Sequence, residues 1–178
     1  MLKKTFINLA LILIGFVLYF LQANFFSWFT INGIKPNLFV IYILFIGLFG
    51  NRSMGIIYGA LWGIFLDLLY GTNVGINLAG LVLIGLLAIL FNKNFSKDSR
   101  ITIMFMVFGT TIIFEVLVYF IKYVLYSTNI EVLNFIEILI VEVIYNILIT
   151  IIIYPLIQKF GYYIENTYKD NKILTRYF

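Results

Sequence analysis

Four ionisable side chains stand inside long apolar runs, and their types could support chemistry. Asp67, Glu115, Lys122 and Glu142 each lie among aliphatic and aromatic neighbours. A charged group at the centre of a lipid bilayer costs about 2.5–3.5 kcal/mol, so such groups usually pair, line a polar path or contact a partner. They therefore predict one of three arrangements: pairing that fixes helix register, a proton or ligand pathway, or polar contacts to another membrane subunit.

The spacing of these residues predicts which of them could meet. Glu115 and Lys122 are seven positions apart, and Glu142 and Asn146 are four apart, so each pair lies on one helical face. Asp67 and Lys122 both fall near the external ends of predicted spans. At that shared depth the two side chains could form an ion pair.

The chain lacks the residues that most catalytic and metal sites need. Cys and His are both absent, which removes disulfides, thiolate nucleophiles, the commonest general base and the usual zinc and haem ligands. The sequence contains no P-loop, and its acidic residues are single and scattered, which argues against a metal site. We therefore expect that the protein is not an enzyme and that it binds no cofactor. The sequence contains no basic, aromatic-rich domain of the kind that would predict nucleic-acid binding.

Composition places the chain in a membrane. Of its 178 residues, 63% are hydrophobic and 11% are charged, whereas soluble domains are about 25% charged. No polar stretch is long enough for a soluble domain. The apolar runs predict an all-α polytopic protein, 1–178, with a basic cytoplasmic tail at 158–178 and six transmembrane helices at about 5–25, 37–50, 54–70, 75–91, 101–126 and 133–157.

Two of these runs are less regular than the others. Lys3 and Lys4 precede the first apolar run, as in a signal peptide, but no small-x-small cleavage site follows, so we expect an uncleaved span. The second run gives about 14 residues of helix, which cover only about 21 Å. This helix could tilt, thin the bilayer, or enter it only part of the way.

The basic residues predict the orientation of the chain. Six spans put both termini on one side, and ten of the twelve Lys and Arg residues fall on that side. Lys35 falls on the other side, and Lys122 lies within a span. Cytoplasmic loops are enriched in Lys and Arg, so we expect both termini to be cytoplasmic. Contact of these residues with anionic membrane lipid is expected as well.

A set of glycines predicts a packing face. The glycines recur at intervals of four and Asp67 continues their stripe: Gly55, Gly59 and Gly63, followed by Gly71 and Gly75. Residues four apart lie on one side of a helix, and a bare glycine groove lets another backbone approach closely in lipid. The stripe predicts contact either with another helix of the same protein or with a partner.

The order of these motifs resembles the MreD family of bacterial rod shape-determining membrane proteins. Asn146 and Pro155 resemble the family's polar residue and late proline in the last span. Asn37 stands where the family usually has an acid, so Asp67 is the stronger equivalent. The other residues that carry the resemblance are Pro36, Leu38, Asn51, Arg52, Gly55, Gly59, Gly63, Leu68, Gly71, Gly75 and Asn77.

The resemblance implies a non-enzymatic subunit of the cell-wall elongation complex in the bacterial plasma membrane. Proteins similar to MreD work with the bitopic protein MreC, the filament protein MreB, and a SEDS glycosyltransferase with its class B penicillin-binding protein. The implied function is to bind MreC and support peptidoglycan synthesis and rod cell shape. Whether the chain also forms a homodimer is left open.

The resemblance also implies an alternative function. The family fold is similar to the substrate-binding S-components of energy-coupling-factor vitamin transporters. Such a subunit needs a polar cavity under its external loops, and this chain offers Asp67, Asn73, Asn77, Lys122 and Asn129 there. The two functions predict different partners, because an S-component binds an ATPase module and a small molecule.

Overall fold

Helices make up nearly all of the chain in the computed structural model, which describes residues 2–51, 53–70, 75–126 and 131–169. The all-α class that the sequence predicts is confirmed. Helix α1 continues through a π-helical turn, η1, into a short α2, and five longer helices follow. Their bounds are α1 Leu2–Phe20, η1 Leu21–Phe25, α2 Phe26–Trp28, α3 Leu38–Phe49, α4 Met54–Tyr70, α5 Ile76–Asn94, α6 Arg100–Tyr126 and α7 Val132–Lys169.

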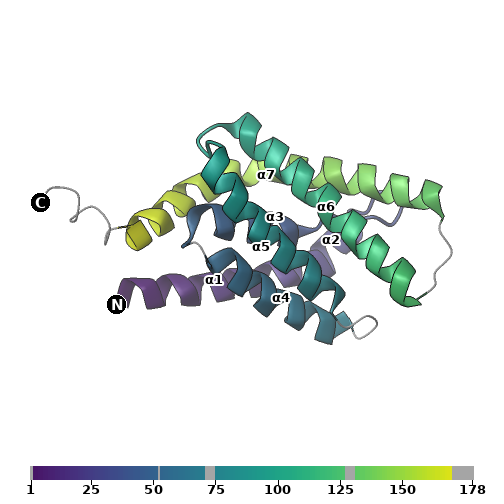
Figure 1. Ribbon diagram of the computed structural model, residues 1–178, viewed down its shortest axis with the longest axis horizontal. Helices are drawn as coiled ribbons and strands as arrows, with labels where there is room; N and C mark the ends of the chain where they lie inside the picture. The colour runs from purple at the N-terminus through teal and green to yellow at the C-terminus, as the bar shows by residue number, and fades with distance from the viewer. Residues whose placement is uncertain (1, 52, 71–74, 127–130, 170–178) are drawn as a thin grey trace, which may run out of the picture.

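Helix α3 is the centre of the bundle (Figure 1). It contacts α1, α4, α5, α6 and α7, and all 12 of its residues are buried. A helix that is apolar on every side is expected in such a position. Twelve residues give only about 18 Å of helix. The surrounding helices cover this short element, so its side chains pack against protein and not against lipid.

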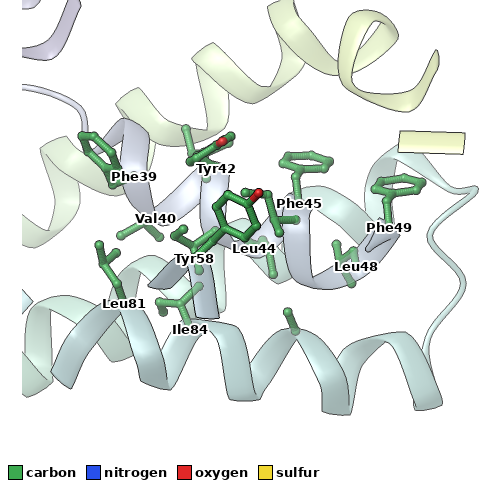
Figure 2. Packing of buried hydrophobic residues seen from close by; sticks show 14 of the residues in the cluster. Phe39, Val40, Tyr42, Leu44, Phe45, Leu48, Phe49, Tyr58, Leu81 and Ile84 are labelled. Carbon is green, nitrogen blue, oxygen red and sulfur yellow. The ribbon is translucent and has the colours of Figure 1, made fainter. Parts of the chain in front are cut away.

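The side chains of α3 form the core by pointing toward all of its neighbours (Figure 2). The ring of Phe39 lies 5.4 Å from that of Trp62 in α4, and the ring of Phe49 lies 5.4 Å from that of Tyr162 in α7. The Tyr42 hydroxyl donates a hydrogen bond to the backbone carbonyl of Leu11 in α1. Burial of this apolar surface holds the bundle together around α3.

The outer surface is also apolar. Leu13, Phe105 and Ile152 are 58%, 70% and 74% exposed, which places large apolar side chains where a soluble protein carries polar ones. Four helical segments of the described chain are long and apolar enough to cross a membrane, while α3 and α4 are apolar but shorter. The protein is therefore a membrane protein. The four segments are Leu2–Trp28, Ile76–Asn94, Arg100–Leu125 and Val132–Tyr168.

Helix α7 is longer than the sequence predicts. We expected this helix to end near 157, but it continues past Pro155 to Lys169, so the first part of the predicted tail is helical. Proline removes one backbone hydrogen bond, which neighbouring helices can offset. The extension packs because Gly161 lies against Phe49, where a Cβ would stand 2.5 Å from the ring. Residues 170–178 lie outside the described part of the chain.

The first turn of α1 and the last turn of α7 lie at the same end of the molecule (Figure 1). We call it the basic end, because most of the basic residues that the structure describes belong to the helix ends and the α5–α6 connection gathered there. Lys35 and Lys122 lie toward the opposite end. The residues of the basic end are Lys3, Lys4, Lys93, Lys97 and Arg100, while Lys159 lies further back along α7, ten residues before its end.

Lys97 joins three segments at the basic end. Its ammonium group donates to the carbonyl oxygen of Leu48 at 3.0 Å, near the end of α3. It also lies 2.8 Å from Oε1 of Glu165 in α7, and both side chains are largely buried, at 13% and 8% exposure. Beside it, the Tyr162 hydroxyl donates to the carboxyl group of Asp98 and, together with Ser96, holds the pKa of that group below its usual value.

We expect Lys97→Met to lower the free energy of unfolding by about 1–3 kcal/mol, because it removes two charge-assisted contacts from a largely buried site. Thermal unfolding in detergent micelles measures the change. Lys93→Met is the matched control, since Lys93 is exposed and belongs to the same end, and its effect should stay within about 0.5 kcal/mol. Equal effects of the two substitutions would contradict the role given to Lys97.

Candidate functional site

Asp67 closes the connection between α4 and α5. Its Oδ2 accepts hydrogen bonds from the backbone N–H groups of Gly75 at 2.9 Å and Leu78 at 3.0 Å. Its Oδ1 accepts from the backbone N–H of Asn77 at 3.0 Å and from the Asn77 side-chain amide at 2.9 Å. Asp67 is only 2% exposed. The backbone donors belong to the start of α5, which an N-cap side chain would usually satisfy.

The start of α5 explains why the cap comes from another helix. Gly75 is the N-cap residue, with φ of +99° in the left-handed region. A side chain is strained in that conformation, and glycine has none with which to cap the helix. The carboxylate of Asp67 takes over that role and also favours the positive end of the α5 dipole. Gly75 and Asn77 thus join Asp67 in one cap, while Gly71 and Arg52 lie outside the described residues.

The ion pair that we considered between Asp67 and Lys122 is not formed. Both residues are described, and the oxygens of Asp67 are occupied by donors from the start of α5. Lys122 is exposed and interacts electrostatically with Glu115 of its own helix. Equal depth was the basis of that expectation, but depth does not determine how two helices are rotated toward each other.

The glycine stripe packs against α5 inside the protein. A Cβ on Gly59 would stand 2.5 Å from the carbonyl oxygen of Leu81, and one on Gly63 would stand 2.5 Å from the Cα of Leu78. At Gly55, a Cβ would stand 3.2 Å from the Cα of Gly85 in α5 and 2.8 Å from the Cα of Gly47 in α3. Small residues four positions apart allow this close contact between the backbones of two membrane helices. Because α5 covers the stripe, no open groove remains there for a partner.

A second set of polar groups surrounds the start of α3. The backbone N–H of Leu38 donates to Oε1 of Gln22 at 2.9 Å, and that of Asn37 donates to Oδ1 of Asn146 at 2.9 Å. The Oδ1 of Asn37 accepts from the Val40 N–H at 3.4 Å, the usual N-cap contact. Pro36 is buried directly before this turn. Three different segments therefore satisfy donors that a short helix would otherwise leave unpaired.

This cluster continues between α6 and α7. The side-chain amide of Asn146 donates to the hydroxyl of Thr111 in α6 at 3.0 Å, and both residues are 0% exposed. Glu142 lies one turn away and has Glu115 of α6 and Asn37 as electrostatic neighbours. Its Oε1 is buried without a hydrogen-bond partner among the described residues. The structure thus brings together the predicted intramembrane groups Glu115, Glu142 and Asn146.

Sequence reasoning missed Gln22 and Thr111. Gln22 belongs to η1, and a π-helical turn interrupts the regular 3.6-residue pattern from which side-chain direction is usually read. A lone Gln at the end of an apolar run was its only signal. Thr111 gave none, since threonine is ordinary in such runs. Asn37 fills the N-cap role through its side-chain oxygen, and Asn and Asp cap helices about equally well.

We expect Asn146→Leu to lower the free energy of unfolding by about 1–3 kcal/mol. The change removes two interhelical hydrogen bonds, each worth about 0.6–1.7 kcal/mol in a membrane, and leaves the Asn37 N–H without its acceptor. Unfolding in detergent, with hydrogen exchange at residues 37–40, measures the effect. Asn134→Leu is the control, since Asn134 is exposed on the same helix. An unchanged stability and unchanged exchange would refute the cap.

Comparison with known proteins identifies the family of the chain. The family model described as rod shape-determining protein MreD matches residues 3–164. The searches of curated proteins and of solved structures gave no match. The matched region contains nearly all of α1, all of α2 to α6, both polar clusters, the glycine stripe and most of α7, and it extends over far more than half of the chain. The chain therefore belongs to the MreD family of rod shape-determining membrane proteins.

Proposed function

We propose that the protein is a non-enzymatic subunit of the cell-wall elongation complex that binds MreC and supports peptidoglycan synthesis and rod shape. The observation that carries this proposal is where its intramembrane polar groups point. Asp67 and Asn146 bind backbone N–H groups of the same chain. Polar residues that cap helices of the same chain hold those helices in place, which suits a rigid scaffold. An uptake subunit would instead direct such groups into an open polar cavity.

The alternative, an S-component of a vitamin transporter, has less support from the same residues. Asp67 and Asn77 bind each other, and Lys122 is exposed. Asn73 and Asn129, which would complete the external pocket, lie outside the described residues. The similarity of fold to S-components stays a prediction.

Copurification of the tagged chain from detergent-solubilised native membranes tests the proposal. We expect MreC to be recovered with it, together with the SEDS glycosyltransferase and the class B penicillin-binding protein, and MreB to follow more weakly through the complex. The same membranes with an untagged chain are the control. Recovery of an ATPase module and a bound small molecule would overturn the proposal in favour of the transporter.

The proposed complex requires the basic end to face the cytoplasm, where MreB forms its filaments. The absence of Cys makes this simple to test with single-cysteine variants. Lys93→Cys at the basic end should react with a membrane-impermeant maleimide only after the cells are permeabilised. Ile31→Cys, in the exposed connection before α3, should react in intact cells. The opposite labelling pattern would reverse the orientation.

A further inference from the structure

Two carboxyl groups meet between α6 and α7, which pack against each other and run in opposite directions (Figure 1). The contact of Asn146 in α7 with Thr111 in α6 fixes the register of the two helices. One turn further along, in the same spatial direction, α7 carries Glu142 and α6 carries Glu115. The hydrogen-bonded layer therefore brings the two glutamates together, and each is a hydrogen-bonding neighbour of the other.

An aromatic contact bounds this pair on its other side. One further turn along α6, the ring of Tyr119 lies 4.2 Å from that of Phe135 in α7. The pair thus lies between a hydrogen-bonded layer and an aromatic layer, near the middle of the apolar segment Arg100–Leu125. Glu142 is only 6% exposed. Neither solvent nor a lipid headgroup surrounds this carboxyl group.

A second observation is that buried polar atoms in this site have no partner. Oε1 of Glu142 and the hydroxyl of Tyr119 are both buried without a hydrogen bond in the described part of the chain. Neither glutamate forms an ion pair with a described residue. Lys122 is exposed and acts on Glu115 only electrostatically. An ionised carboxylate is costly in such a place, whereas a neutral carboxyl group tolerates an unpaired oxygen at a smaller cost.

Two adjacent carboxyl groups in an apolar interior can satisfy each other by binding one proton. Two negative charges side by side repel strongly where the dielectric constant is low, and protonation of one group removes this repulsion. The neutral group then donates its O–H to the remaining carboxylate, as in other carboxyl pairs that share one proton. The result is a charge-assisted hydrogen bond between α6 and α7.

The other titratable groups around the pair leave this arrangement in place. Glu137 of α7 accepts a hydrogen bond from Asn32, and Tyr145 of α7 donates to the carbonyl of Phe29, so both are engaged elsewhere. The η1 turn and the start of α3 contribute amides, which carry no charge. The remaining titratable groups of the neighbouring elements are Tyr119 and Lys122 in α6, Lys35 before α3, and Tyr42 in α3, which binds Leu11.

We propose that Glu115 and Glu142 form a buried proton-binding site, in which one shared proton joins α6 to α7. The proposal goes beyond the scaffold function and does not depend on it. Loss of the proton leaves two carboxylates in contact and weakens the packing of the two helices. The effect extends to α3, because the side chain of Asn37 at its N-cap is also a hydrogen-bonding neighbour of Glu142.

The pH dependence of stability tests the proposal in a range where this chain has few other titrating groups. It contains no His and no Cys, and ordinary carboxyl groups titrate near about pH 4 and Tyr and Lys near about pH 10. We follow unfolding of the full chain in detergent micelles from about pH 6 to about pH 8.5. The folded chain binds one more proton than the unfolded chain, so stability falls as the pH rises. The equilibrium constant for unfolding should increase by up to about tenfold per pH unit.

Conservative variants assign this dependence to the pair. The double change Glu115→Gln and Glu142→Gln keeps the shape of both side chains without a titrating group, so its unfolding constant should be nearly independent of pH. Glu137→Gln, at an exposed position of α7, is the matched control and should keep the wild-type dependence, to which the terminal amino group contributes equally in every variant. A wild-type constant that does not change with pH, or a dependence that survives the double change, would overturn the proposal.

Infrared spectroscopy of the folded protein provides a readout that does not involve unfolding. At neutral pH the wild type should show the C=O band of a buried carboxylic acid, which Glu137→Gln retains and the double change removes. Exchange of Na⁺ for a bulky organic cation at constant ionic strength should leave stability unchanged. Absence of the band would show that both groups are ionised, and a loss of stability without Na⁺ would indicate a metal cation in the site; either result would refute the shared proton.

Discussion

Asp67→Ala should lower the free energy of unfolding by about 3–5 kcal/mol, one of the two largest effects expected for a single substitution in this protein. The carboxylate accepts four hydrogen bonds in a site that is 2% exposed. Alanine leaves the N–H groups of Gly75, Asn77 and Leu78 without this acceptor. Asp67→Asn should cost roughly half as much, because the amide keeps one oxygen but turns an NH₂ group toward these donors.

Unfolding in detergent micelles measures both variants, and hydrogen exchange at residues 75–79 should increase first, because the start of α5 loses its cap. Lys122→Met supplies the decisive control. If Asp67 were stabilised by an ion pair, removal of the lysine would rescue Asp67→Asn. We expect no rescue, and an effect of Lys122→Met alone within about 0.5 kcal/mol, since Lys122 is exposed. Rescue would show that the cap is not the main partner of Asp67.

Gly59→Leu should separate α4 from α5 and lower the free energy of unfolding by about 3 kcal/mol or more. Even a Cβ at this position would stand 2.5 Å from the carbonyl oxygen of Leu81, and a backbone atom cannot move aside as a side chain can. Overpacking usually costs about 1–3 kcal/mol, and leucine adds three further carbon atoms to the clash. Thermal unfolding and far-ultraviolet circular dichroism in micelles measure the loss.

Gly109→Leu is the matched control for Gly59→Leu. Both glycines lie within apolar helices, but a Cβ on Gly109 would meet nothing within 4 Å, so its replacement should leave stability nearly unchanged. A stable, fully helical Gly59→Leu would contradict the close α4–α5 packing. The expected result has a practical consequence: loss of a partner from Gly59→Leu would report unfolding, and partner surfaces should be sought on the outer faces of the helices.

The fold class was accessible from the sequence because apolar runs and turn residues alternate clearly. Gly50 to Ser53 separates two of these runs, and α4 begins directly afterwards at Met54. The end of α7 was predicted too early, since Pro155 and a more polar composition both suggest a stop. Neither feature indicates that Gly161 fits against the Phe49 ring, which lies over a hundred residues earlier in the chain. Contacts that distant leave no local pattern.

The candidate site was predicted in part. Spacing by four correctly places Gly55, Gly59 and Gly63 on one face, but spacing does not reveal which helix covers that face. Asp67 stands out as a charge in an apolar run, and the sequence predicts for it either an ion pair with Lys122 or a contact with another subunit. Three of its four donors are backbone N–H groups, which every residue except proline carries and which a sequence therefore does not mark. Gly75 was the available hint, as a helix start without a capping side chain.

The caps of α3 also bear on how the chain is made. A 12-residue helix is marginal by itself, and this one is held by Gln22 and Asn146 at its start and by Lys97 at its end. Asn146 follows the residue it binds by 109 positions. During synthesis, the Asn146 cap of the central helix is therefore available only after α7 has emerged from the ribosome. The packing around the start of α3 is thus completed only by the last helix to be translated.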